Sequence, residues 1–228
     1  MSSHNRTHNR PKIGTLVIGQ TPRPDLVDPV AQQLPNCDLI QLGALDCVAK
    51  RDLPPIVGDY PLVTRMASGA LVMVEEAFLV PRLQACVREL EAQGVAAAIL
   101  LCAGTFADVH SDQIPLVKPF AAGQAWLRRH GMLSVGFIAP VVEQERPIYE
   151  RWVATGIRPN VWTATLNQQD AAFQAQLNQQ IAAHALEAIV LDYVGHLAEQ
   201  VAQLQQHSPV PVVDLGQLAL QQLTQHIE

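Results

Sequence analysis

The chain alternates between short runs of consecutive apolar residues and longer segments in which apolar residues recur at helical spacing. The run VAAAILLC at 95–102 is apolar throughout, as expected for a parallel strand covered by helices on both faces. Similar runs predict strands at residues 13–18, 38–45, 95–102, 116–120, 133–138, 158–163, 188–191 and 210–213. The segments between them predict helices at residues 26–34, 75–93, 121–130, 141–155, 167–185, 197–207 and 215–227. This alternation predicts an α/β protein built on parallel sheets.

Two pairs of strand-end segments resemble each other. Residues 13–20 (IGTLVIGQ) are similar to 133–140 (LSVGFIAP), and residues 99–106 (ILLCAGTF) to 189–196 (IVLDYVGH). The pattern predicts two related α/β halves; if the halves face each other, their strand ends meet in one cleft. We assign residues 12–105 with 208–228 to the first half and 106–207 to the second, and expect residues 1–11 to form a disordered leader. A β-hairpin is predicted at 62–65 and 70–74, around Ser68-Gly69.

Composition narrows the range of partners. The chain is 49% hydrophobic and 16% charged, with a net charge of −6. Nucleic acid is therefore not an expected partner, because neutralising phosphates requires a basic surface. No apolar run approaches the roughly 20 residues that a membrane helix needs, so a membrane association is not expected either. The polar leader lacks the apolar core of a signal peptide, and the four cysteines form no CxxC pair, which together predict a cytoplasmic protein with reduced thiols.

Cys102 is the sharpest candidate for chemistry. It ends the most apolar predicted strand, just before the small-residue turn Ala103-Gly104-Thr105 and an expected helix start. Backbone N–H groups at such a place stabilise a thiolate and a substrate carboxylate. A thiolate there can act as a base or as a nucleophile. The alternative is a buried, unreactive cysteine, which is the role we expect for Cys37, Cys47 and Cys86.

The turn GQTPRPD at 19–25 offers an anion-binding group. Its prolines stiffen the loop, so Arg23 can present a fixed guanidinium to an anion; a solvated loop arginine is the alternative. Thr105 can offer its hydroxyl and N–H to a carboxylate, or serve as a helix N-cap.

Tyr193 occupies the position in the second half that Cys102 holds in the first. Its phenol, with an ordinary pKa of about 10, donates protons more readily than it removes them at neutral pH. His196 can act as a general base, or open the next helix and face solvent. Because ligands bind beyond the carboxyl ends of parallel strands, we expect these groups to meet in one cleft.

The GQTPRPD motif is similar to the signature of AroM family proteins, as are YPLVTR at 60–65 and the turn from Leu191-Asp192 to Gly195. The resemblance runs from residue 13 to the C-terminus. AroM proteins in turn resemble the aspartate/glutamate racemase superfamily, whose strand ends match LLCAGT at 100–105.

The resemblance implies two α/β halves that face each other across one active-site cleft, in which a cysteine from each half flanks the α-carbon of a small carboxylate. Cys102 would be the first cysteine, and Thr105 with the backbone amides of Ala103 and Gly104 would bind the carboxylate. Tyr193 stands where the second cysteine is expected, which argues against two-cysteine racemisation. Relatives with a single cysteine decarboxylate their substrate and protonate the product on one side. We also predict that four further residues bind the ligand: Gln20, Arg23, Gly195 and His196.

We therefore predict a cofactor-independent isomerase or carbon–carbon lyase that uses Cys102 on a small carboxylic acid, without a metal. The sequence leaves a homodimer open. The alternative from a different class is a carboxylate-binding or sensor protein that has lost catalysis, as Tyr193 in place of a thiol suggests. A redox protein is the weaker alternative, because no resolving cysteine stands near Cys102 in the sequence.

Overall fold

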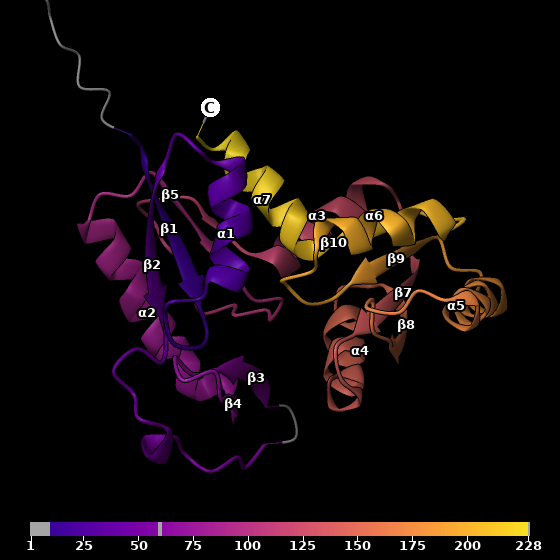
Figure 1. Ribbon diagram of the computed structural model, residues 1–228, viewed down its shortest axis with the longest axis horizontal. Coiled ribbons are helices and arrows are strands. Elements are labelled where there is room, and N and C mark those ends of the chain that lie inside the picture. The colour runs from indigo at the N-terminus through magenta and orange to yellow at the C-terminus, as the bar shows by residue number, and fades with distance from the viewer. Residues whose placement is uncertain (1–9, 59–60, 228) are drawn as a thin grey trace, which may run out of the picture.

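The computed structural model describes residues 10–58 and 61–227 (Figure 1). The predicted leader lies outside the described residues except for its last two, and so does Tyr60 of the motif at 60–65. Within the described ranges, no helix combines the length and the apolar character needed to cross a bilayer.

Two four-stranded parallel sheets share one strand order. The first sheet runs β2-β1-β5-β6, formed by Asp38–Gly43, Lys12–Val17, Ala97–Leu100 and Leu116–Val117. The second runs β8-β7-β9-β10, formed by Arg158–Thr163, Ser134–Ala139, Ala188–Leu191 and Val212–Asp214. Strand β1 thus corresponds to β7, and β5 to β9, as the two sequence similarities predict. The α/β fold with two facing halves is confirmed.

Helices separate most of the parallel strands along the chain, as the periodicity predicts, whereas β5 and β6 are joined by loop. The helices are α1 to α7, at Pro24–Gln33, Glu76–Ala92, Pro119–Arg129, Glu145–Val153, Ala171–His184, Ala198–His207 and Leu215–Gln225. Two short 3-10 helices, η1 and η2, lie at Lys50–Asp52 and Val142–Gln144. Gly94 follows α2 with a φ of +69°, the left-handed conformation that ends many helices.

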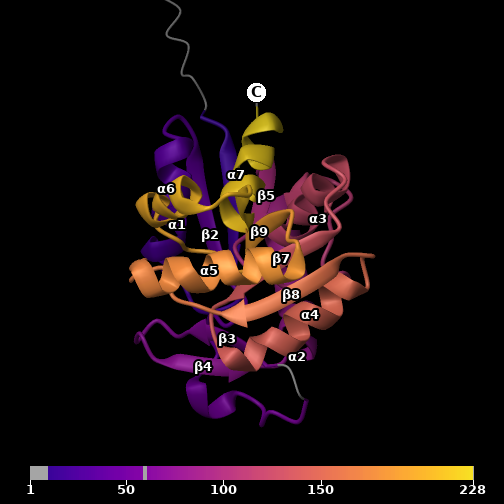
Figure 2. The same cartoon turned by 90° about the vertical axis from the view of Figure 1, so that its right-hand side faces the viewer.

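Helices cover both faces of the first sheet, which explains its uniformly apolar strands. Helix α2 packs on one face through Leu79 and Leu83, and α1 and α7 pack on the other (Figure 1). All four residues of β5 and all four of β9 are buried. The two halves lie side by side with their sheets turned relative to each other (Figures 1 and 2).

Two strands belong to a different sheet from the one that the sequence predicts. Strand β6 pairs with β5, so the first sheet extends to Val117 rather than ending at residue 105. Strand β10 pairs with β9, so Val212–Asp214 belongs to the second sheet. Helix α7 then spans both halves, because Leu215 packs in the core of the second while Leu223 packs in that of the first. Apolar periodicity reports burial of these segments but not which sheet buries them.

Candidate functional site

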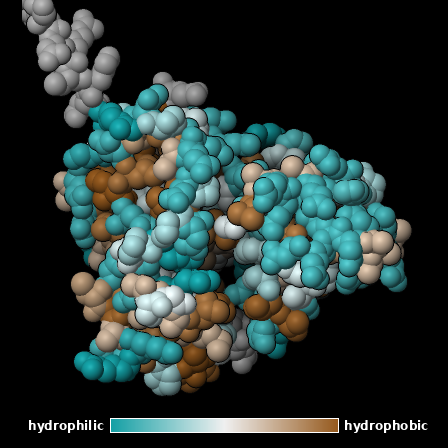
Figure 3. Space-filling view, viewed as in Figure 1, coloured by the Kyte–Doolittle hydropathy of each residue, from teal (hydrophilic) through white to brown (hydrophobic). Residues whose placement is uncertain are grey.

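A cavity of about 240 Å³ lies between the two halves, at the carboxyl ends of β1, β5, β7 and β9. Cys102 and Tyr193 both line it, each two residues beyond the end of its strand. The space-filling view shows the surface hollowed between the two halves (Figure 3). Small-molecule sites commonly have about 300–1,000 Å³, so this volume suits a ligand of few heavy atoms. The predicted meeting of strand ends in one cleft is thus seen for these two residues.

Cys102 is surrounded by groups that keep its thiol protonated. Burial raises its pKa to about 11, and the negative charges of Glu76 and Asp192 act in the same direction. The backbone N–H of Gly104 and the guanidinium of Arg151 oppose this effect without overcoming it. The sequence prediction of an anion-stabilising helix start is wrong, because residues 103–115 form turns and loop that lead to β6. At neutral pH, Cys102 is therefore a proton donor rather than a thiolate.

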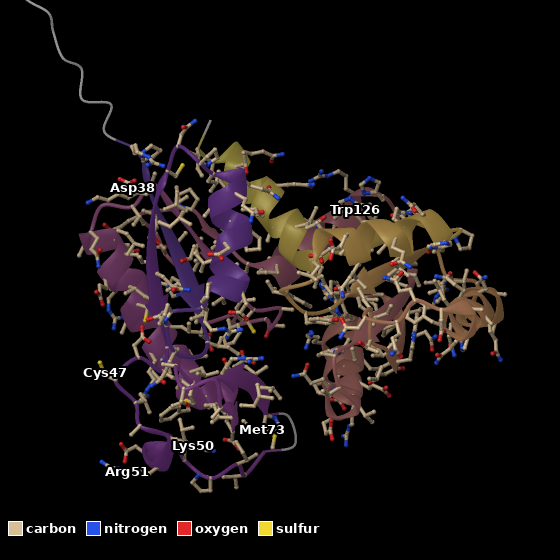
Figure 4. All side chains as sticks on the ribbon, viewed as in Figure 1. Asp38, Cys47, Lys50, Arg51, Met73 and Trp126 are labelled. Atoms are coloured by element: carbon tan, nitrogen blue, oxygen red, sulfur yellow. The ribbon has the colours of Figure 1, made fainter. Side chains whose placement is uncertain are left out.

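We expect iodoacetamide to alkylate Cys102 slowly at pH 7–8, and about tenfold faster for each further pH unit up to about pH 10. The reason is that only the thiolate reacts, and its fraction rises tenfold per unit below the pKa. Peptide mass spectrometry across this range measures the rate. Cys47 is exposed on the side of the first half away from the cavity, and its early labelling marks reagent activity (Figure 4). A Cys102 rate that levels off below pH 9 would contradict the raised pKa.

Asp192 links the end of β9 to helix α4 on the second-half side of the cavity. Its buried carboxylate accepts hydrogen bonds from Arg151 and from the indole Nε1 of Trp152, both on α4. Trp152 is itself fixed by stacking against Phe137, with ring centroids 4.7 Å apart. This arrangement places the Arg151 guanidinium at the wall of the cavity. Asp192 therefore acts as a positioning group for a cation.

Three arginines line the cavity: Arg23, Arg65 and Arg151. Arg23 forms a two-bond contact of 2.8 and 2.7 Å with Asp25, whose pKa this pairing lowers. Arg151 Nε is buried and has no hydrogen-bond partner among the described residues. Arginine binds carboxylates well because its planar N–H groups match the two oxygens. The wall therefore suits an anion.

Tyr193 is the half-buried counterpart of Cys102. Its ring packs on that of His196 at a centroid distance of 3.7 Å. Burial raises its pKa, and the negative charge of Asp214 adds to this effect. Like Cys102, Tyr193 is therefore protonated at neutral pH.

Gln20 fastens the hairpin that forms one wall of the cavity. The hairpin consists of β3 (Leu62–Arg65) paired with β4 (Leu71–Val74), as predicted. Gln20 Nε2 donates to two loop carbonyls, of Leu45 and Val48, and its Oε1 accepts from the N–H of Ala67. Its amide is thus used within the protein, and it does not line the cavity. These bonds show that Gln20 positions the hairpin, whereas its predicted role in ligand binding stays a prediction.

The hairpin can approach this turn closely because residue 19 is glycine. A Cβ at Gly19 would lie 2.4 Å from the Arg65 carbonyl oxygen and 2.5 Å from Thr64 Oγ1. We expect Gly19→Ala to lower the free energy of unfolding by about 1–3 kcal/mol, since backbone must shift to make room. Urea unfolding measures the change. Gly58→Ala is the control, because its Cβ would approach only the Glu75 side chain, at 3.4 Å or more, and should change stability by less than about 0.5 kcal/mol. Equal effects of the two variants would contradict the close approach.

The remaining predicted ligand residues fall into two groups. Ala103 lines the cavity, whereas Gly104 and Thr105 do not. A Cβ at Gly104 would lie 2.5 Å from the Phe106 ring, so this glycine serves packing of the turn. Gly195 and His196 line a different cavity, because the chain turns away from the first one after Val194.

Sequence reasoning missed Arg65, Arg151 and Thr64 as cavity residues. Thr64 Oγ1 is buried and, within the described part of the chain, has no hydrogen-bond partner, so it is available to a ligand. Arg65 and Thr64 lie in the quoted segment at 60–65, which was the available signal. Arg151 lies in an amphipathic helix with no local feature that distinguishes it.

No three histidine, cysteine, aspartate or glutamate side chains within residues 10–58 and 61–227 gather in a way that could hold a metal ion. All four cysteines are free thiols.

Comparisons with known proteins agree with this geometry. The AroM protein family model matches residues 13–227. A crystal structure of arylmalonate decarboxylase aligns with a TM-score of 0.66 at 14% identity, covering 96% of this chain and 93% of that one. An aspartate racemase homologue from Pyrococcus horikoshii OT3 aligns with a TM-score of 0.64 at 13% identity, covering 95% and 99%. Glutamate racemase from Francisella tularensis, in complex with D-glutamate, aligns with a TM-score of 0.56 at 16% identity, covering 95% and 80%. A comparison with the sequences of curated proteins finds no significant match. At these identities, the structural matches show the aspartate/glutamate racemase-like fold.

Proposed function

The chain belongs to the AroM family, and we propose that it is a cofactor-independent enzyme that decarboxylates a small carboxylic acid and protonates the product through Cys102. The observation that carries the proposal is the pair of acids in one cavity. Cys102 and Tyr193 lie at equivalent strand ends, and the pKa of each is raised. Racemisation by proton transfer requires a base on one side of the α-carbon. Two protonated groups instead suit the addition of a proton to a carbanion.

The proposed reaction has two steps. The bond between the α-carbon and one carboxylate breaks, CO2 leaves, and the electron pair spreads onto the remaining carboxyl group as an enediolate. The guanidiniums of Arg23, Arg65 and Arg151 stabilise this charge, since they are already in place before it develops. The Cys102 thiol then gives its proton to the α-carbon, and the resulting thiolate regains a proton from water. The name of arylmalonate decarboxylase describes a decarboxylation of this kind. This chain is similar to that enzyme in fold.

Incubation with acids in D2O tests the proposal. The panel contains phenylmalonate and methylmalonate as decarboxylation substrates, and aspartate and glutamate as racemisation substrates. We expect CO2 release from a malonate, with one deuterium at the α-carbon and one enantiomer in excess. Deuterium exchange in an amino acid without CO2 would overturn decarboxylation in favour of isomerisation.

A second candidate function is a carboxylate-binding or sensor protein, which the phenol of Tyr193 in place of a second thiol favours. The same panel distinguishes it by thermal unfolding. An acid that raises the melting temperature, yet shows neither CO2 release nor deuterium exchange, would support binding without catalysis.

A further inference from the structure

A second cavity, of about 400 Å³, lies behind the wall of the first. It is formed by α1 together with the segments that lead into α6 and α7. Leu26, Leu101 and Val194 line both cavities. Leu101 directly precedes Cys102, and Val194 directly follows Tyr193. The volume falls in the range of about 300–1,000 Å³ that is usual for small-molecule sites.

The two cavities have opposite charge. Three arginines line the first, whereas the second is lined by Asp25, Asp28 and Asp214 and by no lysine or arginine among the described residues. Arg23, from the other side of the wall, already pairs with Asp25. Asp28 at the exposed rim and the buried Asp214 therefore set the charge that a ligand meets.

His196 has buried ring nitrogens that lack a hydrogen-bond partner among the described residues. It lines the second cavity, and its side chain is only 1% exposed. Nδ1 lies 2.8 Å from Asp214 Oδ2 without the alignment of a hydrogen bond, and Nε2 has no partner in the part of the chain that the structure describes. A buried nitrogen without a partner is costly, so it is usually satisfied by a ligand or water. In a neutral ring whose proton is on Nδ1, facing the Asp214 carboxylate, Nε2 is an acceptor.

We propose that this second cavity binds a small organic ammonium ion. Asp28 and His196 Nε2 can accept the N–H groups of the ammonium. Asp214, whose Oδ1 already accepts from the Gln217 N–H and whose Oδ2 faces His196, adds negative charge. The hydrocarbon part of the ammonium ion would contact the shared apolar wall and Leu220. Because the wall carries the residues next to Cys102 and Tyr193, the bound ion lies directly behind the candidate catalytic pair.

Three probes with the same ring and different charge test the site: cyclohexylamine, cyclohexanol and cyclohexanecarboxylate. Isothermal titration calorimetry of the full chain at pH 7 measures their affinities. We expect protonated cyclohexylamine to bind at least tenfold more tightly than cyclohexanol. The variant Asp28→Lys should weaken the amine at least tenfold, because it replaces an attractive charge at the rim by a repulsive one. Asp112→Lys makes the same change in net charge at an exposed loop position outside the cavity and should leave the affinity unchanged.

Equal affinity for cyclohexanol, or equal loss of amine binding in Asp28→Lys and Asp112→Lys, would overturn the proposal. Cyclohexanecarboxylate is repelled by Asp28 and Asp214 and can enter only the first cavity, so it should not compete with cyclohexylamine; competition between these two probes in the unsubstituted protein would also overturn the proposal. Both substitutions lie at exposed positions, and unchanged melting temperatures confirm that the variants fold. The readout is binding alone, so it is independent of any turnover by Cys102.

Discussion

Cys102→Ser will reduce turnover by roughly 10²–10⁴-fold, the usual contribution of one positioned proton-transfer group. The substitution replaces the thiol by a hydroxyl of similar size, which is a far weaker acid and cannot protonate the carbanion at a useful rate. Cys102 lies in a loop at the cavity wall and packs against the apolar core of the first half, and because serine is of similar size we expect the fold to persist. The rate is measured as CO2 release from the most active acid of the panel.

Cys37→Ser is the matched control, because Cys37 is partly buried and lies outside the cavity. Its turnover should stay within about twofold of the unsubstituted protein. Full activity of Cys102→Ser, with its melting temperature unchanged, would exclude Cys102 as the proton donor.

Asp192→Ala should lower the free energy of unfolding by about 3–5 kcal/mol, the usual cost of removing one partner of a buried ion pair. The substitution leaves the Arg151 guanidinium and the Trp152 indole N–H without their acceptor. The side chain of Asp192 is fully buried and that of Arg151 is 18% exposed, so water replaces little of the lost interaction. Urea unfolding, followed by circular dichroism, measures the change.

Asp25→Ala removes the carboxylate that pairs with Arg23, another arginine of the cavity wall, and serves as the control. Asp25 is 52% exposed, so we expect a loss of only about 0–1 kcal/mol. Asp192→Asn keeps an oxygen for one of the two donors and should fall between the alanine variant and the unsubstituted protein. Equal losses for Asp192→Ala and Asp25→Ala would show that burial of the Asp192 pair does not govern stability.

Arg151 illustrates why part of the site could not be predicted. Its partner Asp192 is 41 residues away in the sequence, and the two meet only because α4 packs beside the end of β9. Local periodicity reports which face of a helix is buried, but not which group lies opposite a polar residue on it. Cys102 and Tyr193 were predictable because each lies two residues beyond the end of a fully buried apolar strand.

The roles of Gln20 and His196 were decided in the same way. Both follow predicted strands, where ligand groups gather, and both were assigned to ligand binding on that ground. The structure uses Gln20 to fasten the hairpin and places His196 at the second cavity. Position at a strand end identifies candidates, whereas the direction of the side chain depends on the loop that follows.

The sequence by itself determined the alternation of strands and helices, the two related halves, and the equivalence of Cys102 and Tyr193. These features could be predicted because buried positions are apolar and recur along the chain with the period of a strand or a helix. Only the tertiary structure decided the sheet assignment of β6 and β10, the Asp192–Arg151 pair, the protonated state of Cys102 and the opposite charges of the two cavities. The physical reason is that a pKa or a cavity depends on desolvation and on charges brought together from distant segments, which no local pattern records.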